Sequence, residues 1–91
     1  MNAHRQFVHV VEAKYLGRHR VWLRFDDGLA GEVDLAPHLE GEVLEPLQSP
    51  DVFSRFTLGD ARTLAWPNGA DFAPEFLHDL LARAAVPPDG D

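Results

Sequence analysis

Residues Arg20 to Asp34 carry the sequence RVWLRFDDGLAGEVD. Apolar and polar side chains alternate strictly before Asp26-Asp27-Gly28, as is typical of a half-buried β-strand that enters a tight turn. A three-residue loop over 26–28 places Val21 opposite Val33, whereas a two-residue loop mixes polar with apolar residues on one face. We therefore predict a hairpin with a type I turn that Gly28 closes in the left-handed conformation.

The neighbouring segments extend this hairpin into an antiparallel meander. Residues 7–16 are rich in β-branched and aromatic side chains and predict a preceding strand, with a bulge where Glu12 and Lys14 interrupt the pattern. Residues 62–66 predict a further strand. The order Ser49-Pro50-Asp51 predicts a short helix with the Ser49 hydroxyl as its cap.

The C-terminal part of the chain predicts one amphipathic helix. Pro74 marks its start, and an apolar stripe at helical spacing is expected to face the sheet. The stripe consists of Phe76, Leu77, Leu80 and Leu81. The predicted fold class is therefore α+β: a small antiparallel β-meander packed against a C-terminal helix, with one short additional helix.

Length and composition indicate one small globular domain. The chain has 91 residues, 45% hydrophobic content and no cysteine, so a packed core is expected without disulfides or thiolate metal sites. We place the domain at residues 1–86 and a disordered tail at 87–91. The polar N-terminus has no signal-peptide pattern, and no apolar run could cross a membrane, so a cytoplasmic protein is expected.

Charge is distributed unevenly along the chain. The net charge is −7, yet the first 24 residues are basic and the acids concentrate after them. An acidic surface repels phosphate backbones, which disfavours nucleic acid as a partner. It suits docking onto a basic protein, while the simpler alternative is that it serves solubility. Association with a second copy of the chain is also left open.

Residues suited to catalysis are scattered. The five histidines have no metal-ligand spacing, and the two serines lie in no nucleophile-elbow motif. Glycine-rich phosphate loops are absent from the sequence. We therefore expect no enzyme activity, no cofactor and no metal site.

Two groups of residues are candidates for partner binding. The first is the turn Trp66-Pro67-Asn68-Gly69-Ala70-Asp71, in which Asn68-Gly69 predicts a primed turn and Trp66, Asn68 and Asp71 could form an anchor. Their structural alternatives are a core role for Trp66 and, for Asp71, hydrogen bonds to nearby backbone donors. The second group is Arg20, Trp22 and Arg24 on one strand face, which could grip a nucleic-acid strand. Its structural alternative is pairing of Arg20 with Asp34.

The order of motifs resembles a known bacterial family. The motifs are Phe25-x-Asp27-Gly28, Val33-Asp34-Leu35, Pro46-Leu47 with Pro50 and Phe53, Trp66-Pro67-Asn68-Gly69-Ala70-Asp71, and Pro74-x-x-Leu77. They resemble domain of unknown function 2442 over residues 7–81. The resemblance implies a small α+β fold without an established activity or cofactor. It also implies a gene next to a second small protein, as in toxin–antitoxin pairs.

Two hypotheses for function follow. The first is a non-catalytic protein-interaction or regulatory module, such as an antitoxin-like partner of a basic protein. The second is a domain that binds a small ligand or nucleic acid.

Overall fold

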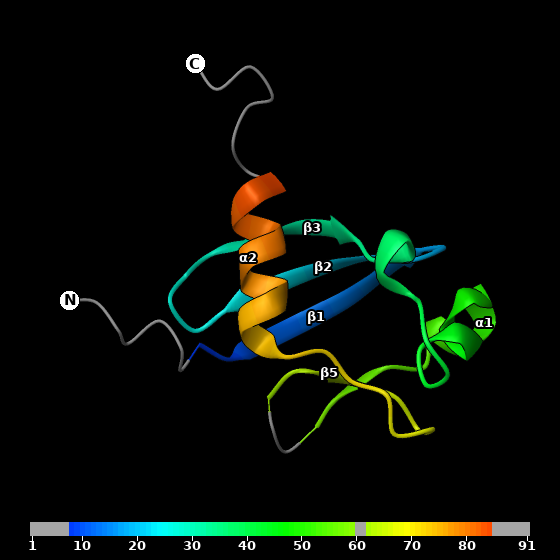
Figure 1. Cartoon of the computed structure of the whole chain (residues 1–91). Helices are drawn as coiled ribbons and strands as arrows, with labels where there is room; N and C mark the ends of the chain where they lie inside the picture. Colours follow the sequence, from blue (N-terminus) through cyan, green and yellow to red (C-terminus); the bar gives the residue numbers. More distant parts are fainter. Residues whose placement is uncertain (1–7, 60–61, 85–91) are drawn as a thin grey trace.

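The computed structural model describes residues 8–59 and 62–84 (Figure 1). In chain order its elements are β1 (Val10–Gly17), β2 (Arg20–Phe25), β3 (Ala30–Asp34), the 3-10 turns η2 (Ala36–His38) and η3 (Glu45–Gln48), α1 (Pro50–Phe53), β4 (Thr57–Leu58), β5 (Leu64–Ala65) and α2 (Pro74–Ala84). The predicted α+β fold is confirmed. The outer parts of the predicted domain 1–86 and the predicted tail 87–91 lie outside the described residues. Neither α1 nor α2 has the length and apolar character needed to cross a membrane.

The β2–β3 hairpin has the predicted register. Val21 lies opposite Val33, and Trp22 lies opposite Glu32. Gly28 has a φ of 94°, and its N–H donates to the carbonyl of Phe25 at 3.0 Å. The alternation of apolar and polar side chains therefore fixes this pairing, because a shift by one residue would turn the apolar side chains to solvent.

Strand β1 completes a three-stranded antiparallel sheet in the order β1-β2-β3. Its pairing with β2 shifts between Val10 and Glu12, which confirms the predicted bulge, and shifts again near Gly17. The backbone N–H of Val10 donates to the carbonyl of Arg62 at 2.9 Å, so this end of the strand also contacts the second hairpin.

The second hairpin pairs β4 with β5 and continues into a turn over residues 66–70. Only Leu64–Ala65 of the predicted strand 62–66 forms a strand. The turn repeats the geometry of 25–29: Trp66 N–H donates to Ala70 O, and Gly69 N–H donates to Trp66 O. The predicted primed turn is wrong. A primed turn needs positive φ at both central residues, but Gly69 has positive φ and Asn68 does not. The Asn68 carboxamide oxygen accepts a hydrogen bond from the N–H of Ala70 at 3.0 Å and so supports the turn from its own side chain.

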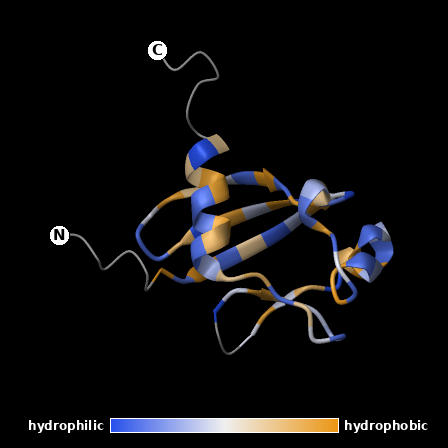
Figure 2. Cartoon of the chain, viewed as in Figure 1, coloured by the Kyte–Doolittle hydropathy of each residue, from blue (hydrophilic) through white to orange (hydrophobic). Residues whose placement is uncertain are grey.

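Helix α2 lies across the sheet (Figure 1), and hydrophobic and hydrophilic residues alternate along it (Figure 2). Leu77 and Leu81 are buried, and Leu80 packs partly buried against the core. A Cβ built on Gly31 of β3 would lie 2.8 Å from Leu81 Cδ1, so glycine permits this close approach. Phe76 was predicted to face the sheet but is 38% exposed. Its ring instead stacks on Phe72 in the segment that leads into the helix.

Trp66 joins the second hairpin to α1. Its side chain is buried at 4% exposure, and its indole N–H donates to the carbonyl of Phe53 at 2.7 Å. That carbonyl is at the C-terminal end of α1, where helix geometry leaves it without a partner in the helix. Helix α1 begins at Pro50 as predicted, but the Ser49 side chain forms no capping hydrogen bond, so the predicted hydroxyl cap is wrong.

Candidate functional site

The outer face of the sheet carries the predicted group Arg20, Trp22 and Arg24. Arg20 pairs with Glu32 at 2.9 Å, diagonally across the β2–β3 pair. The predicted pairing of Arg20 with Asp34 is wrong, because the Asp34 carboxylate accepts a hydrogen bond from the N–H of Ala36 instead.

The remaining members of this group also have intramolecular partners. Arg24 pairs with Glu12 at 3.1 Å, and the ammonium group of Lys14 lies 5.3 Å from the centre of the Trp22 ring. The cations on this face are thus largely balanced by carboxylates of the same sheet. Such a face has little net attraction for a phosphate backbone.

The three candidate residues of the turn 66–71, Trp66, Asn68 and Asp71, do not form one site. Trp66 is buried, which agrees with the core role named as its structural alternative and removes it from the candidate anchor. Asn68 is exposed, and its side-chain N–H donates to the carbonyl of Val43 at 3.0 Å. This hydrogen bond holds the segment between η2 and η3 against the turn. Asp71 is exposed and forms a backbone bridge with Ala65. Within the turn, the Asn68 carboxamide oxygen accepts a hydrogen bond from the N–H of Ala70.

Asp71 lies at a groove beside the N-terminal end of α2, here called the α2 groove. The groove has a volume of about 510 Å³. It is lined by Pro37, His38, Glu40, Leu44, Asp71, Phe72, Ala73 and Phe76. These residues come from the segment after β3, the segment before α2 and the first turn of α2. Tertiary packing therefore brings together parts of the chain more than 30 residues apart, as the pair His38 and Asp71 illustrates.

Aromatic rings form the apolar part of the α2 groove. Phe72 and Phe76 stack with ring centres 5.7 Å apart and planes inclined by 10°. The His38 ring lies nearly perpendicular to the Phe76 ring, with centres 5.2 Å apart and planes inclined by 84°. Phe72 is buried, whereas Phe76 is 38% exposed, so the stack presents its outer ring to solvent. An exposed ring with a fixed neighbour can bind a flat or apolar group with little loss of side-chain entropy.

The charges around the α2 groove have one sign. Glu40 and Asp71 line it and are both exposed. The two stretches of chain that contribute its lining, 36–54 and 63–82, contain no lysine or arginine. Their acids are Glu40, Glu42, Glu45, Asp51, Asp71, Glu75 and Asp79. Asp51 and Asp79 are paired with Arg55 and Arg83, whereas Glu40 and Asp71 line the groove itself. The carboxylates of Glu40 and Asp71 therefore make the groove attract cations and repel anions.

Sequence reasoning found Asp71 but missed Phe76, His38 and Glu40 as members of one site. Two sequence signals were present: the i,i+4 spacing of Phe72 and Phe76, and the lack of basic residues over 36–54. Neither signal shows that these segments meet.

The histidines of the described chain mostly bind neighbouring groups. His78 pairs with Asp27 at 2.7 Å, and His9 pairs with Asp26 at 3.0 Å. The pKa of Asp26 is lowered, first by the backbone N–H of His9 and then by its ring. The pKa of Asp27 is lowered first by the backbone N–H of Leu29, and the His78 ring adds to this. Within residues 8–59 and 62–84, no cluster of His, Asp or Glu side chains is arranged to hold a metal ion.

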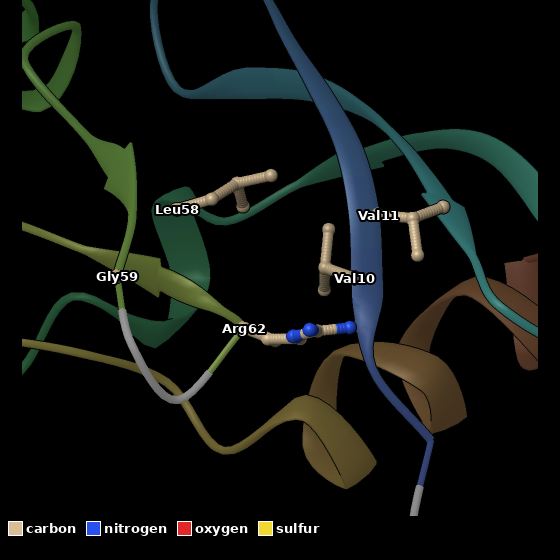
Figure 3. Close-up of a pocket in the computed structure, with 5 residues that line it drawn as sticks. All are labelled: Val10, Val11, Leu58, Gly59 and Arg62. Carbon is tan, nitrogen blue, oxygen red and sulfur yellow. The ribbon is translucent and has the colours of Figure 1, made fainter.

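A second hollow of about 300 Å³ lies between β1 and the β4–β5 hairpin (Figure 3). Leu58 and Arg62 face β1 there, and Val10 and Val11 complete the lining with Gly59. The hollow borders residues 60 and 61, which the structure does not describe. The α2 groove, whose lining is described throughout, is therefore the candidate site.

Comparison with known proteins identifies the family. No curated protein matches the chain significantly, and no solved structure does so. The model of one family, described as Protein of unknown function (DUF2442), matches residues 10–81. This range runs from the first residue of β1 into α2 and includes both hairpins, the 66–71 turn and every residue that lines the α2 groove. Since the match covers most of the length of this chain, the chain belongs to the DUF2442 family.

Proposed function

We propose that this protein is a non-catalytic binding module that docks a basic segment of another protein in the α2 groove. The observation that carries the proposal is the combination in one groove of an exposed aromatic ring, Phe76, with the carboxylates of Glu40 and Asp71. Binding hot spots commonly combine an aromatic anchor with polar groups around it. The surrounding acidic stretches would speed encounter with a cationic partner.

Support also comes from how the groove is held. The hydrogen bond from Asn68 to Val43 fixes the loop that precedes Leu44, and the turn itself is fixed by its backbone hydrogen bonds. A preformed groove loses less conformational entropy on binding than a mobile one. Asn68 thus acts as a positioning residue, and Trp66 supports the turn from the core. The family resemblance implies an antitoxin-like form of this function, and the polar N-terminus predicts a cytoplasmic protein; both stay predictions.

The paired charges on the sheet favour this function over nucleic-acid binding. The basic residues on the outer face of the sheet have carboxylate partners, and the α2 groove would repel phosphate. No comparable observation favours a small anionic ligand.

The proposal can be tested by NMR titration of the labelled protein. The probes are a short basic peptide and an acidic peptide of equal length. The basic peptide is expected to shift the backbone signals of Glu40, Asp71 and Ala73 in a saturable way, with the effect reduced at high salt. No saturable shift, or shifts confined to other surfaces, would refute the proposal.

A matched pair of variants separates the groove from the general field of the protein. The double variant Glu40→Gln with Asp71→Asn removes two charges from the groove. The double variant Asp51→Asn with Asp79→Asn removes two charges from exposed i,i+4 ion pairs on α1 and α2. The first is expected to weaken binding about ten-fold, and the second by less than about three-fold, because screened charges at a distance contribute little. Equal losses would show that net charge alone drives association.

A further inference from the structure

We infer that the α2 groove selects arginine, rather than lysine, in the segment that it binds. This inference rests on the proposed function and specifies the side chain that the site recognises. It follows from the placement of the aromatic stack relative to the carboxylates.

Phe76 is the exposed ring of the α2 groove: it is 38% exposed, whereas Phe72 is buried. The Phe72 ring lies nearly parallel to the Phe76 ring, and the His38 ring lies nearly perpendicular to it. A guanidinium group is planar and weakly hydrated, so it can lie flat on such a ring without losing much hydration. An ammonium group is compact and strongly hydrated, and contact with the ring would remove part of its water shell.

The acidic residues supply the second half of the recognition. Glu40 and Asp71 come from different segments but line the same groove as Phe76. Arginine has several N–H donors in a rigid plane and can bind a carboxylate through two of them while its plane contacts a ring. A purely apolar side chain would desolvate these carboxylates without compensation, and an acidic side chain would be repelled by them.

The experiment compares two peptides that differ only in their basic residue. Both are short, capped and built from glycine and serine, with arginine in one and lysine at the same positions in the other. The arginine peptide is expected to bind about three- to ten-fold more tightly, as measured by NMR titration at neutral pH. Equal affinities would overturn the inference and leave the proposed function standing. If neither peptide binds, the proposed function fails as well.

A variant identifies the ring as the source of selectivity. Phe76→Leu keeps an apolar side chain but removes the aromatic face, so it should weaken the arginine peptide to the level of the lysine peptide and leave the lysine peptide unchanged. The control is Tyr15→Leu, which removes an aromatic residue of similar exposure (40%) outside the α2 groove. Its selectivity should match that of the wild type. An equal loss for both peptides in Phe76→Leu would overturn the inference.

A direct measurement in the wild-type protein does not depend on any variant. Protons on the arginine δ-carbon that lie over a ring shift upfield and give intermolecular cross-peaks to the Phe76 ring protons. Saturable binding without these signals would show that arginine binds through charge alone, and would overturn the inference.

Discussion

Trp66→Phe tests whether Trp66, at the start of the 66–71 turn, is part of the core. The substitution removes the indole N–H that donates to the Phe53 carbonyl, a buried hydrogen bond of 2.7 Å. It also replaces the indole by a smaller phenyl ring. The indole packs against Phe53, Phe56 and Phe72, whose ring centres lie between 5.5 and 6.1 Å from its own. Both effects act on the junction between α1 and the second hairpin.

The expected cost combines two terms. Leaving a buried carbonyl without a donor costs about 1–3 kcal/mol. The space left by the smaller ring adds about 1–2 kcal/mol, by analogy with core deletions of a few heavy atoms. The total of about 2–5 kcal/mol is a large share of the free energy of unfolding of a small domain, which is about 5–15 kcal/mol.

Urea unfolding followed by circular dichroism measures this loss. The matched control is Trp22→Phe, which changes the chain's other tryptophan, a half-buried side chain on the outer face of the sheet. It should cost less than about 1 kcal/mol, as is usual for partly exposed positions without a buried hydrogen bond. If Trp66→Phe cost no more than this control, the core assignment of Trp66 would be refuted.

Three further predictions concern stability. Gly28→Val should lower the free energy of unfolding by about 1–2 kcal/mol, because Gly28 has a φ of 94° and a β-branched residue resists that conformation. Gly28→Asn should cost clearly less, and equal costs in urea unfolding would contradict this prediction. Leu77→Ala should cost about 2–5 kcal/mol and the half-buried Leu80→Ala about 1–2 kcal/mol, and the reverse order would show that the packed side of α2 is misassigned. Asp26 and Asp27 have lowered pKa values, so their stabilising contribution is present above the ordinary value of 3.8 and is lost as pH falls through the lower folded values. Unfolding measured down to about pH 2 should therefore show a smaller loss of stability in Asp26→Asn with Asp27→Asn than in the wild type, and parallel losses would contradict the assignment.

Secondary-structure elements that depend on neighbouring residues could be predicted from the sequence pattern. The alternation in Arg20 to Asp34 admits one register, because the side-chain period of two and the turn residues agree. Pro74 and the apolar spacing after it likewise place α2. The bulge in β1 follows from the same reasoning, since the polar residues interrupt the pattern of the strand.

The partners of single side chains could not be predicted where they are distant in sequence. The ring of Trp66 finds its acceptor 13 positions away, and the side chain of Asn68 finds the Val43 carbonyl 25 positions away. Arg20 lies opposite Asp34 in the strand register but pairs with Glu32, and the Asp34 carboxylate accepts from the N–H of Ala36. Pairing of this kind is decided by three-dimensional geometry.

The sequence by itself determined the meander, its central register, the C-terminal helix and the excess of acids, because each follows from neighbouring residues or from composition. Only the tertiary structure decided that Trp66 is buried, that Phe76 stands exposed on Phe72, and that Glu40 and Asp71 line one groove. The physical reason is that burial and proximity depend on how the helix, the turn and the loop after β3 pack together. A side chain's own segment specifies its conformation, whereas its environment is supplied by segments elsewhere in the chain.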